Sequence, residues 1–184
     1  MTKVAYVEWP DGLIIGSAQW QVIEERVNNS RCDVLITNEM PFGAWRPMNS
    51  DYVAGEAQNW ADENETALDT LSKLNVKAVL SSRPIVMQGK LVNEAFALEN
   101  GNYTALHHKH FFPAEQGWHE AAWFHQIMPG FDVHKVAGLN IGVQLCTELM
   151  FTEKSRQYGR DGADLIVVPR ASGENTVNWN AACA

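Results

Sequence analysis

Two segments of the chain carry apolar residues at the spacing of a helix that buries one face. The first has the apolar residues Trp20, Ile23 and Val27. Ser17 precedes it, and serine favours the position before a helix because its hydroxyl accepts a backbone hydrogen bond. The second covers residues 50–75, where acidic residues lie opposite the apolar stripe and Gly55 is a candidate interruption. The pattern predicts one helix in each segment.

Short apolar runs predict strands before, between and after these helices. They lie at residues 4–8, 33–37, 76–82, 85–87, 91–98, 103–108, 141–145 and 164–168. The pairs Gln88-Gly89 and Asn100-Gly101 separate three of the runs, and glycine-containing pairs between apolar runs are typical of hairpin turns. The sequence therefore predicts an α/β protein whose sheet is mixed.

A strand, a sharp turn, a helix and a second strand follow one another near the end of the sequence. The run at residues 141–145 leads into Cys146, and the pattern of residues 148–158 predicts a helix before the run at 164–168. This order is that of a βαβ unit, in which the two strands lie in parallel.

Three chemically useful side chains each follow a predicted strand: Glu39, Lys109 and Cys146. Active-site residues of open α/β sheets collect at the carboxyl ends of strands, so we expect these three to lie close together. Residues 110–130 combine prolines, glycines and aromatic residues without a clear period, which predicts a long loop with a helical turn near Glu120. Long loops inside a compact domain are usually functional.

Composition narrows the class of protein. The 184 residues include 14 Lys and Arg against 22 Asp and Glu, a net charge of −8, which argues against a nucleic-acid partner. A hydrophobic content of 46% without a long apolar run indicates one packed domain over residues 1–184 and no membrane span. Three separated cysteines and no signal peptide favour a reduced, cytoplasmic protein.

The three strand-end residues suggest nucleophilic chemistry. A thiol attacks only as the thiolate, so Cys146 needs a base or a nearby cation. Glu39 could be that base, while Lys109 could stabilise the thiolate and then the negative charge that develops on the substrate. The backbone N–H of Thr147, at the start of the following helix, could be a second donor to that charge.

Three segments carry a resemblance to a known family. They are Leu35-Ile36-Thr37-Asn38-Glu39-Met40-Pro41-Phe42-Gly43, His107-His108-Lys109-His110-Phe111 and Ile141-Gly142-Val143-Gln144-Leu145-Cys146-Thr147-Glu148-Leu149-Met150-Phe151. In order and spacing they resemble the three catalytic blocks of the nitrilase superfamily of carbon–nitrogen hydrolases. Residues 162–169 are similar to the family's strand after the nucleophile helix. The resemblance implies an αββα sandwich, of which this chain would form a part.

The resemblance also implies roles. Glu39 would be the general base, Lys109 the cationic stabiliser and Cys146 the nucleophile. Glu120, in Glu120-Ala121-Ala122-Trp123-Phe124, fits the position of a further acidic residue that orients the lysine or the substrate, and Glu115 is a second choice. The expected substrate is a small amide, nitrile or carbamoyl compound, with an amide favoured. No metal or organic cofactor is expected, and the partner would be a second copy, in a homodimer or a larger homo-oligomer.

Two departures from the family pattern matter. Thr147 stands where members usually have an aromatic residue, so the rule that distinguishes true nitrilases cannot be applied. The match spans only the first two thirds of the family fold. We therefore expect a C-terminally incomplete domain, either a fragment or a shortened member completed by a partner, and we favour the fragment. Residues 178–184 read as the start of a helix.

Several alternatives stay open. Trp45, Trp123 and Arg170 are candidate substrate-binding residues, with Tyr52 and Trp118 near the first two. His108 or His110 could pair with Cys146 in a Cys–His acyl hydrolase. A histidine-rich metal site is a further alternative, although the ligand spacing is not that of a known motif: its members would be His107, His108, His110, His119, Glu115 and Glu120. A non-catalytic binding or regulatory module would use the loop aromatics Phe111, Phe112, Trp118, Trp123 and Phe124 as an interface.

Overall fold

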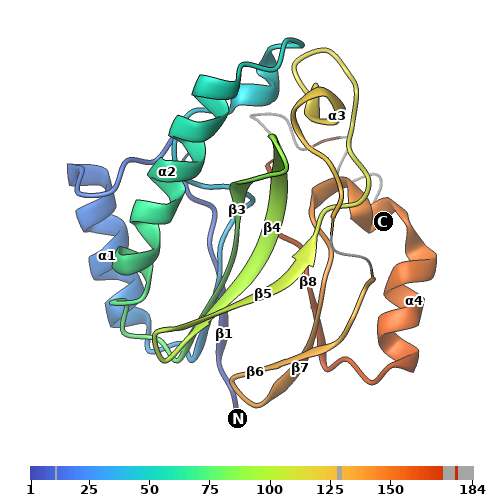
Figure 1. Cartoon of the computed structure of the whole chain (residues 1–184). Coiled ribbons are helices and arrows are strands. Elements are labelled where there is room, and N and C mark those ends of the chain that lie inside the picture. Colours follow the sequence, from blue (N-terminus) through green and yellow to red (C-terminus); the bar gives the residue numbers. More distant parts are fainter. Residues whose placement is uncertain (11, 128–129, 172–176, 178–184) are drawn as a thin grey trace.

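The computed structural model describes residues 1–10, 12–127, 130–171 and 177. In this part of the chain the strands form two sheets (Figure 1). The first has the order β1 (Val4–Tyr6), β2 (Val34–Ile36), β3 (Ala78–Met87), β4 (Lys90–Glu99) and β5 (Asn102–His108). The second has the order β6 (His134–Val136), β7 (Leu139–Val143) and β8 (Leu165–Val167). The helices are α1 (Ala18–Ser30), α2 (Ala54–Leu71), α3 (Glu120–Trp123) and α4 (Thr152–Arg160), with short 3₁₀ helices at Arg46–Met48 and Cys146–Met150.

Both sheets are mixed. In the first, β1, β2 and β3 are parallel, whereas β3, β4 and β5 form two antiparallel hairpins. In the second, β6 and β7 are antiparallel and β7 and β8 are parallel. The parallel pairs need helical crossovers, which α1, α2 and α4 provide.

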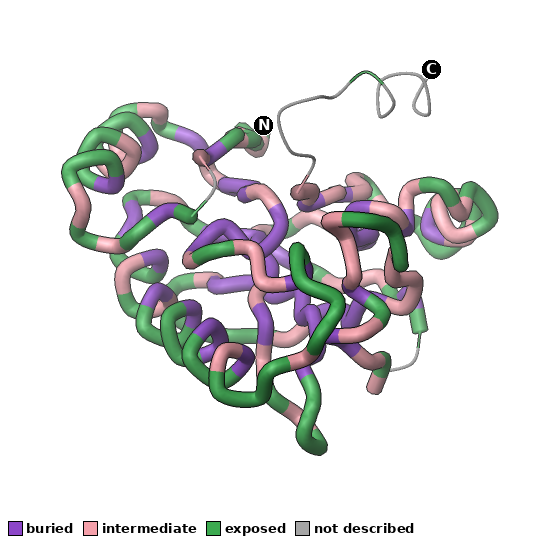
Figure 2. The backbone as a smooth tube through the Cα atoms, turned by 90° about the horizontal axis from the view of Figure 1, so that it is seen from above, coloured by how far each residue is buried: buried purple, intermediate pink, exposed green. Residues whose placement is uncertain are grey.

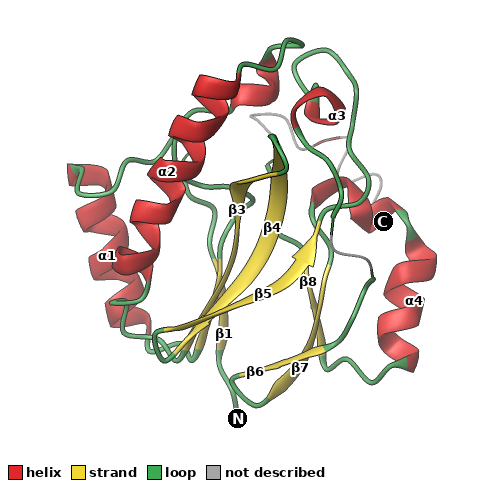
Figure 3. Cartoon of the chain, in the orientation of Figure 1, coloured by secondary structure: helices red, strands yellow, loops and turns green. Residues whose placement is uncertain are grey.

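Helices cover the outer faces of the two sheets, and the inner faces pack on each other (Figures 1 and 3). Strand β2 shows how the sequence specifies this. Leu35 belongs to the apolar cluster shared with α1 and α2, whereas Val34 and Ile36 belong to the cluster between the sheets. On the other side, the Tyr158 hydroxyl of α4 donates to the Val143 carbonyl oxygen of β7 at 2.7 Å. The expected αββα arrangement is confirmed, with buried segments running through its middle (Figure 2).

Local signals predicted several elements correctly. The Ser17 hydroxyl accepts a hydrogen bond from the Trp20 N–H at 3.1 Å and begins α1. The two predicted hairpin turns join β3 to β4 and β4 to β5. The predicted βαβ unit is present as β7, α4 and β8, and α3 supplies the expected turn in the long loop.

Other boundaries differ from the prediction. Strand β3 continues through Pro84 to Met87 instead of ending before it, because β2 pairs with β3 only as far as Leu80 and proline is tolerated where one side has no partner strand. Helix α2 is shorter than expected, and Gly55 lies in its first turn without interrupting it. Strand β6 was not predicted.

The predicted helix at residues 148–158 is wrong as a single element. A 3₁₀ helix ends at Met150 and α4 begins at Thr152. The Glu148 side chain accepts a hydrogen bond from the Leu145 N–H at 2.7 Å, which supports the tighter turn. The predicted helix at residues 178–184 lies outside the described residues. Among the helices that the structure describes, none has the length and apolar character to cross a membrane.

Candidate active site

Glu39, Lys109 and Cys146 meet at the seam between the two sheets. Glu39 follows β2 and Lys109 directly follows β5, both in the five-stranded sheet, whereas Cys146 follows β7 in the three-stranded sheet. Their exposed fractions are 2%, 0% and 2%. The charged side chains are therefore shielded from water. A buried charge of this kind needs a partner of opposite charge or a hydrogen-bond donor or acceptor.

Lys109 lies between two carboxylates. Its Nζ is 2.9 Å from Glu39 Oε1 and 2.7 Å from Glu120 Oε2. Burial alone would lower the pKa of Lys109, but the charges of Glu39 and Glu120 outweigh it and hold the pKa above its ordinary value. The lysine is therefore a permanent cation, and the predicted contact between Glu120 and Lys109 is present.

Two carboxylates share this one cation, which affects Glu120. Burial raises the pKa of Glu120 to about 7, and the charge of Glu39 adds to the effect while Lys109 opposes it. One oxygen, Glu120 Oε1, is buried and has no hydrogen-bond partner among the described residues.

Glu39 has two further donors, which orient its carboxylate. Asn93 Nδ2 donates to Glu39 Oε1 at 2.8 Å, and the Ala171 N–H donates to Oε2 at 3.2 Å. Asn93 is fully buried in β4 and was missed by the sequence analysis. The signal that could have identified it is a polar residue inside an apolar strand run, since such a residue needs a buried partner.

Cys146 is joined to Glu39 through the same Ala171. Its Sγ donates to the Ala171 carbonyl oxygen at 3.6 Å, while the Ala171 N–H holds the Glu39 carboxylate. The Cys146 N–H donates to the Pro169 carbonyl oxygen at 3.0 Å, and φ at Cys146 is +52°, in the left-handed region. Burial, followed by the charge of Glu39, raises the pKa of the thiol well above its usual range, although Lys109 opposes this. The resting thiol is protonated and needs a base.

Thr147 contributes a contact that crosses the seam. Its hydroxyl donates to the Phe111 carbonyl oxygen at 2.9 Å, which ties the turn after Cys146 to the segment after Lys109. The role of its backbone N–H as a donor to substrate stays a prediction.

A cavity of about 580 Å³ opens beside Glu39. Its wall is largely apolar and includes Met40, Trp45, Met48 and Trp118. The rings of Trp45 and Trp118 lie 5.2 Å apart, and Trp45 Nε1 donates to the Gly117 carbonyl oxygen at 3.4 Å. Trp45 is thus placed where a substrate could reach it.

The other candidate specificity residues lie elsewhere. Trp123 is fully buried, donates from Nε1 to the Asn49 carbonyl oxygen at 2.8 Å, and packs against Tyr52. The Arg170 carbonyl oxygen accepts a hydrogen bond from the Glu39 N–H at 3.2 Å. Neither is among the described residues that line the cavity.

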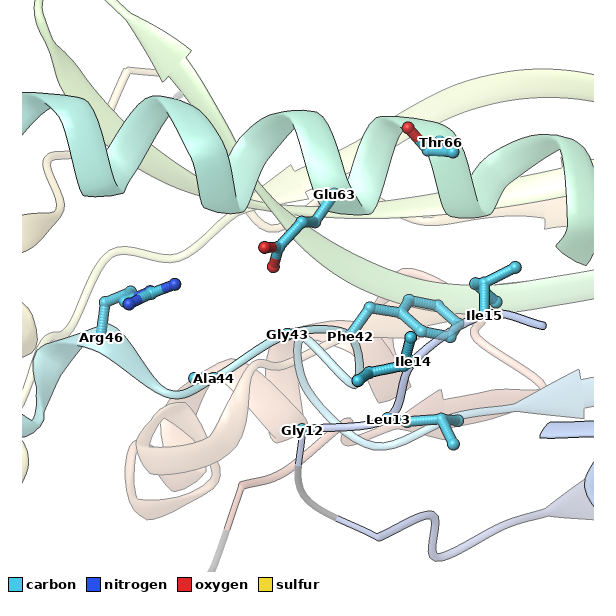
Figure 4. A pocket seen from close by; sticks show the side chains of 10 residues that line it. All are labelled: Gly12, Leu13, Ile14, Ile15, Phe42, Gly43, Ala44, Arg46, Glu63 and Thr66. Atoms are coloured by element: carbon cyan, nitrogen blue, oxygen red, sulfur yellow. The ribbon is translucent and has the colours of Figure 1, made fainter. Parts of the chain in front are cut away.

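A second cavity, of about 470 Å³, lies between residues 12–15 and α2 (Figure 4). Its wall includes Leu13 and Phe42, and the side chains of Arg46 and Glu63 point toward one another across it. Gly43 lines both cavities with φ +78°, and a side chain there would meet Glu63 and Trp60. The loop therefore needs glycine at this position.

Two neighbouring histidines of β5, His107 and His108, each contact a carboxylate. His108 Nε2 lies 3.1 Å from Glu94 Oε2, and His107 Nε2 lies 2.8 Å from Glu148 Oε2. Within the described ranges, no group of three or more histidine, cysteine or acidic side chains is arranged to hold a metal ion.

Comparison with known sequences identifies the family. The sequence matches the family model described as carbon–nitrogen hydrolase over residues 17–182. The chain belongs to the carbon–nitrogen hydrolase family. The resemblance of the three segments to the nitrilase superfamily is confirmed, and membership in the carbon–nitrogen hydrolases supports a hydrolase that acts on carbon–nitrogen bonds. No curated protein matches the sequence.

Solved structures share the carbon–nitrogen hydrolase fold. A carbon–nitrogen hydrolase from Helicobacter pylori G27 matches with a TM-score of 0.79 at 16% identity, over 98% of this chain and 67% of that chain. An amidase from Nesterenkonia sp. matches with a TM-score of 0.73 at 19% identity, over 95% and 67%. A glutamine-dependent NAD+ synthetase from Acinetobacter baumannii matches with a TM-score of 0.75 at 18% identity, over 98% and 34%. The chain thus spans about two thirds of the first two proteins.

Proposed function

We propose that this carbon–nitrogen hydrolase cleaves the C–N bond of a small amide through a thioester on Cys146, with Glu39 as base and Lys109 as cationic stabiliser. One observation carries the proposal. Glu39 contacts Lys109 directly and is linked to the Cys146 thiol through a single residue, Ala171. A carboxylate, an ammonium and a thiol in one water-poor seam are the groups that this chemistry needs.

The first half of the reaction forms the thioester. Glu39 accepts the thiol proton, and the sulfur of Cys146 attacks the carbonyl carbon, so that the electron pair of the C=O bond moves to oxygen. Lys109 and the Thr147 N–H stabilise this oxyanion. When the oxyanion collapses, the C–N bond breaks and protonated Glu39 gives its proton to the departing nitrogen. The products are ammonia or an amine and an acyl-Cys146.

The second half hydrolyses the thioester. Glu39 accepts a proton from water, and the resulting hydroxide attacks the acyl carbon. The C–S bond then breaks, and Glu39 returns the proton to the Cys146 sulfur. Lys109 stays protonated throughout, because the flanking carboxylates raise its pKa. The raised pKa of the thiol fits a cysteine that is deprotonated by a base during the reaction.

Structures of a fold relative support an amide over a nitrile as substrate. The amidase from Nesterenkonia sp. AN1 has been solved with butyramide and with acrylamide. In another of its structures, the acetamide moiety of fluoroacetamide is covalently added at the active site cysteine. By analogy, the apolar cavity beside Glu39 would hold the acyl part of a small amide.

Replacing Glu39 with glutamine tests the base. We expect Glu39→Gln to lower kcat/KM for amide hydrolysis by about 10²–10⁴-fold, because glutamine cannot accept the thiol proton. Ammonia release measures the effect. Glu115→Gln is the control and should change the rate little, because Glu115 is exposed and it is Glu120 that contacts Lys109. If Glu39→Gln keeps most of the activity, a Cys–His mechanism is favoured instead.

Replacing Trp45 with alanine tests the acyl site. Because Trp45 lines the cavity, we expect KM to rise about tenfold for butyramide and less for acetamide, which reaches less of the wall. Steady-state kinetics on both amides measure this, and thermal unfolding checks that the packing of Trp45 against Trp60 is not the cause. Equal changes for the two amides would remove Trp45 from the proposed acyl site.

Two points from the sequence analysis remain to be tested: the expected homo-oligomer and the alternative of a non-catalytic module. The homodimer or larger homo-oligomer can be checked by the mass of the protein in solution. A non-catalytic module would show no amide turnover and no preference of an electrophile for Cys146 over Cys32 and Cys183. Intact-mass measurement with fluoroacetamide, followed by mapping of the adduct, distinguishes this module from a hydrolase.

A further inference from the structure

Glu148 lies two residues after Cys146, and its side chain is completely buried. Its carboxylate accepts three hydrogen bonds from two segments that are far apart in the sequence. Oε2 accepts from the Leu145 N–H at 2.7 Å and from His107 Nε2 at 2.8 Å. Oε1 accepts from the His110 N–H at 2.7 Å. A buried charge with this many donors is held firmly in one orientation.

The donors adjoin the residues proposed to react. Leu145 directly precedes Cys146, and His110 directly follows Lys109. Leu145 comes after β7 of the three-stranded sheet, whereas His107 lies in β5 of the five-stranded sheet. The two oxygens of one carboxylate therefore join the peptide before the nucleophile to the peptide after the lysine, across the contact between the two sheets.

This link matters because the proposed catalytic groups are divided between the sheets. Glu39 and Lys109 belong to one sheet and Cys146 to the other. The apolar cluster between the sheets holds them together, but apolar contact has little directionality. Hydrogen bonds to a charged acceptor are directional and stronger than those to a neutral one. The neutral bond from Thr147 to Phe111 crosses the same seam and is weaker support. The bonds that Arg170 and Ala171, after β8, make with Glu39 also cross it, but they hold Glu39 and not the segment after Lys109.

We propose that Glu148 is a positioning residue that fixes Cys146 relative to Lys109 across the two sheets. The inference rests on the proposed function for its kinetic consequences, but the geometry that it describes is independent of the substrate. A displacement of about 1 Å between reacting groups can lower a rate about 10²-fold. Loss of the link should therefore affect the chemical step more than substrate binding.

The test compares two buried carboxylates that each bind a histidine. Glu148→Gln keeps the length of the side chain but leaves only one acceptor oxygen for three donors. Glu94→Gln is the matched control, since Glu94 accepts from His108, next to Lys109, but its partners all lie within one sheet. We expect Glu148→Gln to lower kcat about 10²-fold with KM within about threefold, and Glu94→Gln to change kcat by less than about threefold.

A second readout needs no substrate. The charges of Glu39 and Lys109 act on the Cys146 thiol, so displacement of the thiol should change the pH at which it reacts. With iodoacetamide, we expect the midpoint of Cys146 alkylation to shift by about one pH unit or more in Glu148→Gln, and by less than about 0.3 in Glu94→Gln. If wild-type protein hydrolyses no amide but this difference is present, the proposed function fails and the positioning role stands. Equal effects of the two variants on kcat and on the midpoint would overturn the positioning role of Glu148.

If Glu148→Gln does not fold, hydrogen exchange of the wild-type protein decides. The amides of Leu145 and His110 should exchange as slowly as the Gln144 amide, which donates to the Val167 carbonyl oxygen of β8 at 3.0 Å, because all three would open only together with the packed sheets. Exchange of either amide at least about 10²-fold faster than that of Gln144 would show that the carboxylate does not hold the two segments, and would overturn the proposal.

Discussion

Replacing Cys146 with alanine is expected to lower kcat/KM for amide hydrolysis by at least about 10⁴-fold. The reason is that the proposed reaction passes through a bond to the Cys146 sulfur, and no other described side chain in the seam can form a thioester. Ammonia release measures the loss. In addition, intact mass after treatment with fluoroacetamide should show an adduct on the wild-type protein that the variant lacks at this position.

The matched control is Cys32→Ala. Cys32 is also buried but lies two residues before β2, where its sulfur accepts a hydrogen bond from the Ser30 hydroxyl. We expect this variant to keep its turnover and its adduct at Cys146. Turnover by Cys146→Ala within about tenfold of wild type would contradict nucleophilic catalysis by this residue.

Replacing Lys109 with methionine is expected to abolish turnover and to lower the free energy of unfolding by about 3–5 kcal/mol at pH 7 or above. Methionine is close to lysine in volume, so the loss of packing is small. The cost comes from Glu39 and Glu120, which without the cation between them must either stay buried as unpaired charges or take up protons that the unfolded chain has released. Urea unfolding measures the change, and Lys135→Met, at an exposed position of β6, is the control.

The pH dependence distinguishes this cause from a general defect in packing. In the wild-type protein, burial raises the pKa of Glu120 to about 7, above its ordinary value. Between these two values the folded protein holds a proton that the unfolded chain has released, so the contribution of Glu120 to stability is complete at low pH and is lost as pH rises through about 7. Without Lys109 the pKa of Glu120 should rise further. The stability difference between variant and wild type should therefore shrink toward pH 5, and a difference independent of pH would contradict the charge argument.

Local rules explain which elements could be predicted. The Ser17 cap and the Gln88-Gly89 and Asn100-Gly101 turns depend on residues that are neighbours in sequence. The extension of β3 through Pro84 could not be predicted in the same way, because it depends on where the adjacent strand β2 stops pairing. Strand β6 is three residues long and pairs with β7 over all three, too short a run to show a period.

The same difference between local and distant contacts decides which residues of the candidate site could be predicted. Glu39, Lys109 and Cys146 could be found because each follows a strand and because their segments resemble family blocks. Asn93 and Glu148 escaped because their partners are distant, 54 residues away for the Asn93 contact with Glu39 and 38 for the Glu148 contact with His110. Their polar character within apolar surroundings signals a buried partner without saying which one.

At position 146 the chemistry and the left-handed backbone favour different residues. The reaction needs a sulfur atom there, but the φ of +52° is one that glycine or asparagine adopts more readily than cysteine, at a cost of about 1–2 kcal/mol for a residue with an ordinary side chain. A ranking of substitutions by stability alone would therefore favour glycine at position 146 and would give a more stable but inactive protein. Any stabilised version of this chain should be designed with position 146 held constant, together with the contacts that keep its turn in place.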